Sequence, residues 1–195
     1  MKPKIDNDII FTASLEVFAR YGFRKTTVQD IADRLTMTKG NLYRYAKNKR
    51  DLYEKTVSWA LLRWQDNVRR AIAGESEVAN QFRVMCRSAV AYLATDPDLR
   101  QVLAADPDIF PMFPGNDPYA AINTASMEMI KTLLKRGIRL RRFRTVDVDT
   151  AAETIFGIYK MMIIRGYIRN EEKRLEQMFE QALELMTHGL LLLEK

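Results

Sequence analysis

Two short helices joined by a tight turn are predicted for TTVQDIADRLTMTKGNLYRYAKNKRDL, residues 26–52. Thr27 and Asp30 have the spacing of a capping box, in which each side chain bonds the other residue's backbone N–H, so a helix should begin after Thr27. Its apolar face is formed by Ile31, Ala32 and Leu35. After a turn at residues 36–38, a second helix is expected from Lys39 to about Ala46.

A third helix is predicted upstream, from about Asp8 to Tyr21, with Gly22 just past its end, where a left-handed residue is common. Three helices of this kind, with a three-residue turn between the last two, describe a helix-turn-helix. In that unit the last helix lies in the major groove of DNA. The sequence therefore predicts a DNA-binding domain at residues 1–50.

The charge distribution points the same way. The chain has a net charge of +6, and residues 1–50 hold 11 Lys/Arg and 5 Asp/Glu, whereas residues 51–195 hold 20 of each. A basic segment attached to a neutral body is typical of a module that binds a polyanion. A solvated basic face without a partner is the alternative.

The stretch from Ile10 to Leu52 resembles the N-terminal domain of TetR-family regulators. The shared features occur in order as FARYGF at 18–23, TTVQDIA at 26–32 and TKGNLY at 38–43, followed by Lys49 and Leu52. A looser similarity to the family's regulatory domain covers the linker at 140–152. The resemblance implies an all-α regulator with a ligand-binding and dimerisation domain, here residues 51–195.

The resemblance also implies roles for single residues. Base-edge contacts are implied for Lys39 and Gly40, and phosphate contacts for Thr27, Tyr43, Tyr45 and Lys49, while Arg44 takes a position that often faces DNA. The chemistry of the helix adds Asn41, which can read a base edge, and Thr38, which opens the helix. Tyr43 and Tyr45 could instead pack in a small core.

Two residues depart from the family pattern. Thr36 stands where the turn usually has glycine, and Ala46 stands where an aromatic residue is usual. Thr36 is expected to alter the turn slightly, and Tyr53 is a candidate to fill the space that Ala46 leaves. Neither change removes a group expected to contact DNA.

Apolar residues recur at three- and four-residue spacing through the rest of the chain, so helices are predicted throughout. They are expected at about 48–73, 78–94, 119–136, 148–169 and 171–193, with further helix starts at two Asp-Pro-Asp motifs, residues 96–98 and 106–108. Residues 107–118 are rich in proline and are expected to form an irregular loop.

A pocket for a small, largely apolar effector is predicted in this body, because Met and aromatic side chains suit an adaptable apolar site. Its candidate lining residues are Phe82, Met85, Phe110, Phe113, Met127, Phe156 and Tyr159. Ordinary core packing is the alternative for each. The basic linker between Lys135 and Arg144 could bind an anionic group of the ligand or could be a solvated loop.

A homodimer is predicted through the last two long helices, whose apolar stripes exceed what a small body needs. The candidate interface residues are Ile155, Tyr159, Met162, Met178, Ala182, Met186 and Leu190. The alternative is that both stripes are buried inside one subunit.

Catalysis, a metal and a cofactor are not expected. The chain has one histidine, His188, and one cysteine, Cys86, and it lacks a phosphate-binding glycine loop. Without a signal peptide or a membrane span, a cytoplasmic location is expected. The sequence thus predicts a regulator, by family default a repressor, that leaves a palindromic double-stranded DNA operator when an unknown effector binds. A ligand-independent architectural or nucleoid-associated DNA-binding protein is the alternative.

Overall fold

The computed structural model describes residues 6–109, 117–163 and 172–192. Within them the chain is helical and contains no β-strand, which confirms the all-α prediction. The helices are α1 (Asn7–Lys25), α2 (Val28–Arg34), α3 (Lys39–Leu42), α4 (Lys49–Ala73), α5 (Val78–Thr95), α6 (Pro97–Ala105), the 3₁₀ turn η1 (Pro107–Ile109), α7 (Ala120–Arg139), α8 (Val148–Ile163) and α9 (Glu172–Leu190). None of the described helices is long and apolar enough to cross a membrane.

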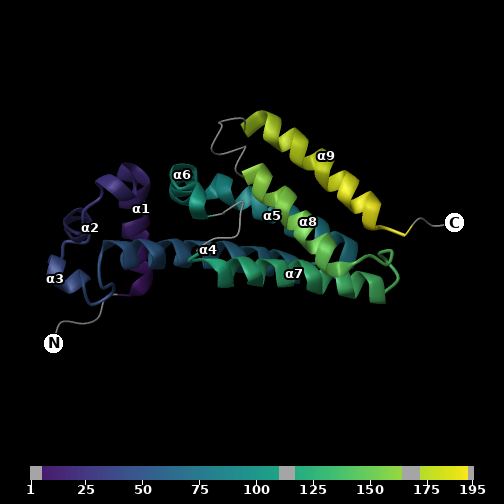
Figure 1. Cartoon of the computed structure of the whole chain (residues 1–195), viewed down its shortest axis with the longest axis horizontal. Helices are drawn as coiled ribbons and strands as arrows, with labels where there is room; N and C mark the ends of the chain where they lie inside the picture. Colours follow the sequence, from purple (N-terminus) through teal and green to yellow (C-terminus); the bar gives the residue numbers. More distant parts are fainter. Residues whose placement is uncertain (1–5, 110–116, 164–171, 193–195) are drawn as a thin grey trace.

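The molecule is elongated, with a small head at one end and a longer body (Figure 1). We use "head" for residues 7–48, which hold α1 to α3, and "body" for residues 49–192. Helix α4 begins beside α3 and runs along the body, where it packs on α5 and α7. Helix α6 packs across α1, and α9 lies at the outer edge. One cluster of buried side chains runs through both parts.

Side-chain caps fix where the helices begin. The capping box of Thr27 and Asp30 is present, with the Thr27 N–H donating to the Asp30 carboxylate at 2.7 Å. Asn48 caps α4 by accepting from the Asp51 N–H at 2.9 Å, and Asp96 caps α6 in the same way, with Pro97 at the first helical position. These local signals were readable in the sequence because donor and acceptor lie three residues apart.

Helices α1 and α3 differ from the predictions. Gly22 does have a positive φ of 73°, but helical structure resumes after this kink and continues to Lys25. Helix α3 ends at Leu42 instead of Ala46, and the chain continues in tighter turns, with the Tyr45 N–H donating to the Leu42 carbonyl at 2.9 Å. The chain must turn here because the next helix starts at Lys49.

Thr36 adopts a left-handed conformation, with φ at 52°. This is the turn position at which the family usually has glycine, and the backbone geometry explains the preference, because a side chain with a Cβ is strained there. The helix-turn-helix therefore keeps its usual turn and carries some strain at this residue.

A close contact between Gly137 and Phe143 packs the end of α7 against the linker that follows it. Gly137 in α7 lies so near the Phe143 ring that a Cβ at Gly137 would sit 2.0 Å from the ring's Cδ2. The ring is 2% exposed and packs edge-on against Phe82, with 6.1 Å between ring centroids. Beyond Phe143, the Arg144 N–H donates to the Leu190 carbonyl at 2.8 Å, so the end of α9 is fastened to the linker.

Candidate functional site

Helix α3 presents a set of hydrogen-bond donors on the outer end of the head (Figure 1). Lys39 and Arg44 are exposed, and the Tyr43 side chain is 45% exposed. Lys39 Nζ lies 5.9 Å from the centroid of the Tyr43 ring. Gly40 is open on its outer side, where an added Cβ would meet only the Thr38 hydroxyl, at 4.0 Å. This surface can approach an anionic, grooved partner without rearrangement.

The remaining predicted contact residues of the head also hold structural positions. Thr38 caps α3 by accepting from the Asn41 N–H at 3.3 Å, and Asn41 is half-buried. The Thr27 hydroxyl donates to the Asp30 carboxylate at 2.8 Å while remaining exposed. Tyr45 is half-buried against the core.

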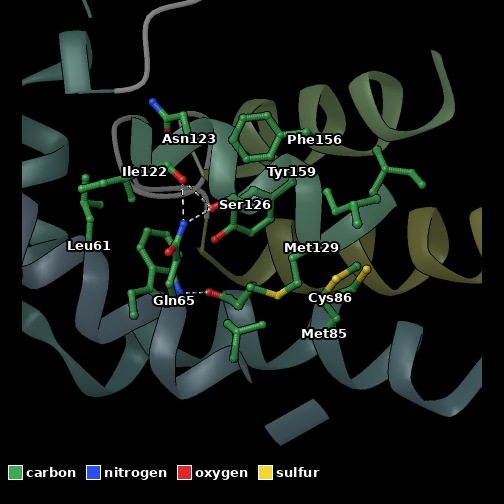
Figure 2. Close-up of a pocket in the computed structure, with 15 residues that line it drawn as sticks. Leu61, Gln65, Met85, Cys86, Ile122, Asn123, Ser126, Met129, Phe156 and Tyr159 are labelled. Atoms are coloured by element: carbon green, nitrogen blue, oxygen red, sulfur yellow. Dashed lines mark hydrogen bonds between the residues drawn. The ribbon is translucent and has the colours of Figure 1, made fainter. Parts of the chain in front are cut away.

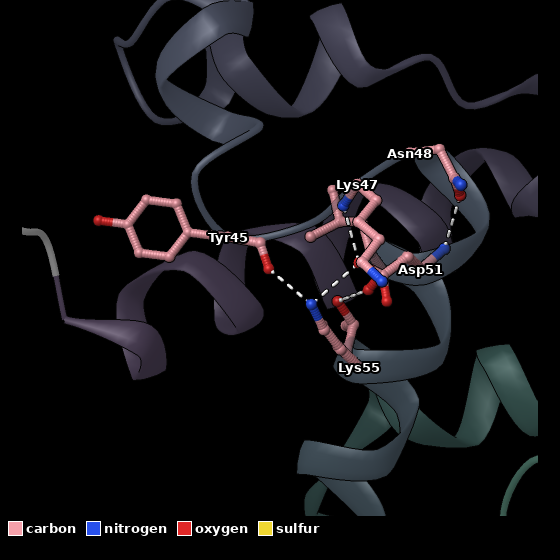
Figure 3. Close-up of polar contacts among 7 residues, drawn as sticks. Tyr45, Lys47, Asn48, Asp51 and Lys55 are labelled. Atoms are coloured by element: carbon pink, nitrogen blue, oxygen red, sulfur yellow. Dashed lines mark hydrogen bonds and ion pairs between the residues drawn. The ribbon is translucent and has the colours of Figure 1, made fainter.

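A polar network fixes the junction between α3 and α4 (Figure 3). Lys55 Nζ donates to the Tyr45 carbonyl at 3.0 Å and contacts the Asp51 carboxylate at 2.9 Å. The Lys47 N–H donates to the same carboxylate at 2.7 Å, and these bonds hold the pKa of Asp51 below its usual value. Figure 3 shows the Tyr45 ring pointing away from this network. The network ties the end of the α3 turn to α4, so the two move together.

Lys49 is engaged inside the head. Its Nζ donates to the carbonyls of Phe23, Arg24 and Thr26 at 2.9, 3.3 and 3.0 Å, and it lies 4.6 Å from the centroid of the Phe23 ring. An ammonium group has three hydrogens, and here each has a carbonyl acceptor. Lys49 thus joins the start of α4 to the end of α1.

Tyr53 links the head to the body. The centroid of its ring lies 5.0 Å from that of the Phe18 ring and 4.9 Å from that of the Phe23 ring. Its hydroxyl donates to the Asp106 carboxylate at 2.7 Å, and burial together with this bond raises the pKa of Tyr53. Asp106 ends α6, so this bond links α4 to α6 within the body, a contact that the helix-start prediction did not include.

The body contains an apolar cavity between α4, α5, α7 and α8 (Figure 2). Most of its lining is aliphatic, aromatic or sulfur-containing: Leu61, Trp64, Val68, Met85, Cys86, Ala89, Ile122, Met129, Ile130, Ile155, Phe156 and Tyr159. Burial raises the pKa of the Cys86 thiol to about 12, so the thiol stays neutral. Such a space suits an apolar molecule of moderate length.

Gln65 is the polar group that crosses this cavity. It is buried, and its Nε2 donates to the Ile122 carbonyl at 2.6 Å and to the Ser126 hydroxyl at 2.7 Å, which ties α4 to α7 (Figure 2). Its Oε1 accepts from Arg69 Nη2 at 3.1 Å. A ligand in the cavity would therefore touch α4 through a side chain that also positions an arginine.

The head has a clear match among known families. Residues 10–56 match the profile of "Bacterial regulatory proteins, tetR family", and these residues form α1, α2, α3 and the first turns of α4. The matched stretch is the helix-turn-helix whose α3 donors face outward. Residues 10–56 of this chain therefore form a DNA-binding domain of the tetR type.

TetR-family relatives also resemble the chain over nearly its whole length. A curated relative, the "Fatty acid metabolism regulator protein" of Bacillus subtilis (strain 168), is 22% identical over 191 residues, which is 93% of each chain. Among solved structures, FadR from Bacillus subtilis in complex with stearoyl-CoA superimposes with a TM-score of 0.80 at 20% identity, covering 94% of this chain and 99% of that one. A TetR transcription regulator from Haloarcula marismortui gives 0.82 at 18% identity, covering 95% and 97%. These similarities show that the body shares the fold of these regulators.

The predicted pocket of the body is partly the observed cavity. Met85, Phe156 and Tyr159 line it, whereas Phe82 is buried against Phe143 and Met127 does not reach it. Phe110 and Phe113 lie outside the described residues. Sequence reasoning missed Gln65 and Met129; for Gln65 the signal was a polar residue on the buried stripe of α4, between Leu61 and Val68.

The predicted dimer residues separate into two groups. Ile155, Met162 and Leu190 are 7%, 4% and 7% exposed, and Tyr159 lines the cavity, so these side chains already pack within one subunit. Met178, Ala182 and Met186 are half-buried on α9. Among the described side chains of α9, the most exposed large apolar one is Leu185, at 75%, which the sequence analysis did not select.

Proposed function

We propose that this regulator is a homodimeric repressor that holds a palindromic operator through α3 and releases it when a long acyl ligand occupies the cavity of the body. The division of labour follows the predicted domains, residues 1–50 for DNA and 51–195 for ligand and dimerisation. It would act where the chromosome is, in the cytoplasm. The observation that carries the proposal is the apolar cavity against α4, the helix that continues into the head.

On the DNA side, Lys39 and Asn41 at the start of α3 suit base-edge acceptors. Gly40 permits close approach, and Thr27, Tyr43, Arg44 and Tyr45 suit phosphate oxygens. Lys49 was expected to contact phosphate, but its three donors are directed at carbonyls of the head. We therefore assign Lys49 the role of positioning α4 against α1.

On the ligand side, the lining is almost entirely apolar, and an extended hydrocarbon chain matches that chemistry. The Bacillus subtilis relatives are a fatty acid metabolism regulator and FadR with stearoyl-CoA, a ligand with a long acyl chain. Their shared fold makes an acyl chain the first candidate for this cavity too.

Two contacts can carry a change in the cavity to the head. Helix α4 holds the cavity residues Leu61 and Gln65 near its middle and Lys49 at its start, so a tilt of α4 would move α1 and α3 with it. Tyr53 ties the same helix to Asp106 at the end of α6. A ligand that favours one tilt would shift the distance between the two recognition helices of a dimer, with a typical coupling of about 1–3 kcal/mol.

For the dimer, the outer faces of α8 and α9 are the candidate surface. Leu185 on α9 and Met161 on α8 are exposed large apolar side chains, and Met178, Ala182 and Met186 are partly open beside them. Leu185→Asp should give a folded monomer in sedimentation, with weaker operator binding. If the variant dimer were as stable as the wild-type dimer, α9 would not form the interface.

The function is tested by selecting an operator from random DNA with the purified protein and then titrating palmitoyl-CoA and palmitate into the complex. We expect a palindromic site and release of DNA by an acyl ligand. Ala89→Phe, which fills the cavity from α5, should keep operator binding and lose release, whereas Ala91→Phe on the exposed face of α5 should behave as wild type. Binding without sequence preference, unaffected by any acyl ligand, would instead support an architectural DNA-binding protein.

A further inference from the structure

A groove adjoins the apolar cavity on the side of the body where α4, α5 and α7 meet. Its lining includes Arg69 from α4, Gln81 from α5, and Met129 and Arg136 from α7. Met129 lines the cavity as well as the groove. The bond between Arg69 and the cavity residue Gln65 also spans the two spaces. Cavity and groove are therefore neighbours separated by a flexible methionine and one glutamine.

Both arginines of the groove are held by buried glutamines. Arg69 Nη2 donates to Gln65 Oε1 at 3.1 Å, and Arg136 Nη1 donates to Gln81 Oε1 at 3.0 Å. Each glutamine is itself fixed by its Nε2, which donates to a main-chain carbonyl, that of Ile122 for Gln65 and that of Glu75 for Gln81, at 2.6 Å in both cases. Each guanidinium has five N–H donors, and the glutamine takes one of them.

The groove has an uncompensated positive charge. Among the described residues, no carboxylate lies within ion-pair distance of Arg69 or Arg136. One carboxylate, Glu128, lines the groove, and it pairs with Lys131 at 3.1 Å. Two guanidinium groups in one groove repel each other unless an anion lies between them. An oriented pair of this kind is suited to phosphate.

We propose that this groove binds the phosphate-bearing head group of the ligand whose acyl chain occupies the cavity, so that the effector is an acyl ester of a phosphorylated carrier and not a free fatty acid. This inference rests on the proposed function, because it assumes an acyl chain in the cavity. The chain would pass between Met129 and Gln65, and a methionine side chain can move aside readily.

The arrangement also explains why the head group matters for signalling. A phosphate that draws Arg69 toward Arg136 weakens the bond between Arg69 and Gln65, and Gln65 is the residue that ties α4 to α7. The anionic end of the ligand would thus act on the same helix that reaches the head. A fatty acid, whose single carboxylate lacks the phosphate groups, would fill the cavity without this effect.

The test measures the Kd of palmitoyl-CoA, palmitate and coenzyme A for the full-length protein and for Arg69→Gln and Arg136→Gln. Matched controls are Arg70→Gln, an exposed neighbour on α4, and Lys135→Gln, an exposed neighbour on α7. We expect each groove variant to bind palmitoyl-CoA roughly tenfold more weakly, since a bond to a charged group is removed. Palmitate binding should be unchanged, which also shows that the cavity is intact. The controls should match wild type for both ligands.

Raising the salt concentration should weaken wild-type binding of palmitoyl-CoA more than binding of palmitate, because partly exposed charges are screened. Equal palmitoyl-CoA affinity in the wild type, the groove variants and the controls would overturn the head-group site while leaving the acyl cavity standing. If the wild type bound neither palmitoyl-CoA nor palmitate, the proposed function itself would fail, and the head-group site with it.

Discussion

Helix α3 in the head and helix α4 in the body place their functional side chains in opposite ways. Helix α3 has four residues, is fixed by the Thr38 cap, and directs Lys39 outward into solvent. Helix α4 has 25 residues and directs Leu61 and Gln65 inward to a cavity that three other helices complete. Function in the head thus depends on which groups are exposed, and function in the body depends on the space that packing leaves. A surface substitution can therefore change function in the head, whereas function in the body changes mainly when the core packing changes.

The largest effect on stability is expected from Gly137→Ala, which disrupts packing in the body. The new methyl group would lie 2.0 Å from Phe143 Cδ2, and the buried ring has no free space. We expect the free energy of unfolding, measured by denaturant titration, to fall by about 3 kcal/mol, because overpacking a core is destabilising. Gly74→Ala is the control, because its nearest atom would be 3.5 Å away at a φ of −74°. A stable Gly137→Ala protein would show that the body tolerates repacking.

Lys39→Ala tests the head in the opposite sense, with a large functional effect and little change in stability. The side chain is exposed, and its Nζ lies 5.9 Å from the centroid of the Tyr43 ring. We expect the free-energy preference for operator over random DNA to fall by about 2 kcal/mol, as measured by fluorescence anisotropy. The midpoint of unfolding should not change. The same substitution at Lys135 in the body should leave DNA binding intact. If the Lys39→Ala protein discriminated operator from random DNA as well as the wild type does, Lys39 would not contact base edges.

Tyr53→Phe tests the junction between the two regions. Removing the hydroxyl leaves the Asp106 carboxylate without this 2.7 Å bond, and we expect about 1.5 kcal/mol of destabilisation. Because the pKa of Tyr53 is raised in the folded state, the contribution is complete below the unfolded pKa of about 10 and declines as pH rises above it. Thermal unfolding at neutral and alkaline pH checks both points. Tyr21→Phe, at an exposed tyrosine, should have no effect at either pH.

The smallest effect, and a stabilising one, is expected from Thr36→Gly. Its φ of 52° strains a residue with a Cβ. Glycine should raise the free energy of unfolding by about 1 kcal/mol after its own entropy cost, seen as a higher Tm. Thr36→Ala keeps the Cβ and should bring no such gain. Equal Tm values for the two variants would mean that the turn is relaxed at this position.

The same contrast explains what the sequence could predict. The capping box at Thr27 and the helix start at Asp96 depend on residues that are close in sequence, so they were predicted and found. The cavity depends on how helices far apart in the chain are rotated. Met127 and Met129 share α7 and a similar sequence pattern, yet only Met129 lines the cavity. Choosing between them needs the packing of α7 against α4, which no local pattern contains.

Contacts across the chain account for the other differences. Phe82 was expected in the pocket but faces Phe143, and Lys49 was expected at phosphate but meets carbonyls at the end of α1. In both cases a partner distant in sequence occupies the side chain. Residue type alone gave their chemistry, apolar or cationic, and the tertiary fold decided what they contact.

The pairing of Phe143 with Leu191 makes α9 a lever with one fixed end. Two main-chain bonds hold that end, from Arg144 to Leu190 at 2.8 Å and from Leu192 to Arg142 at 3.2 Å. Along its length α9 is linked to α5 by the exposed ion pair of Arg87 and Glu180, and exposed pairs resist motion weakly. Phe179 and Leu183, midway along α9, are 5% and 2% exposed, so the buried face of the helix holds it to the body. Moving α9 while its C-terminal end stays attached would therefore expose apolar surface in the middle of the helix, and this cost opposes the motion.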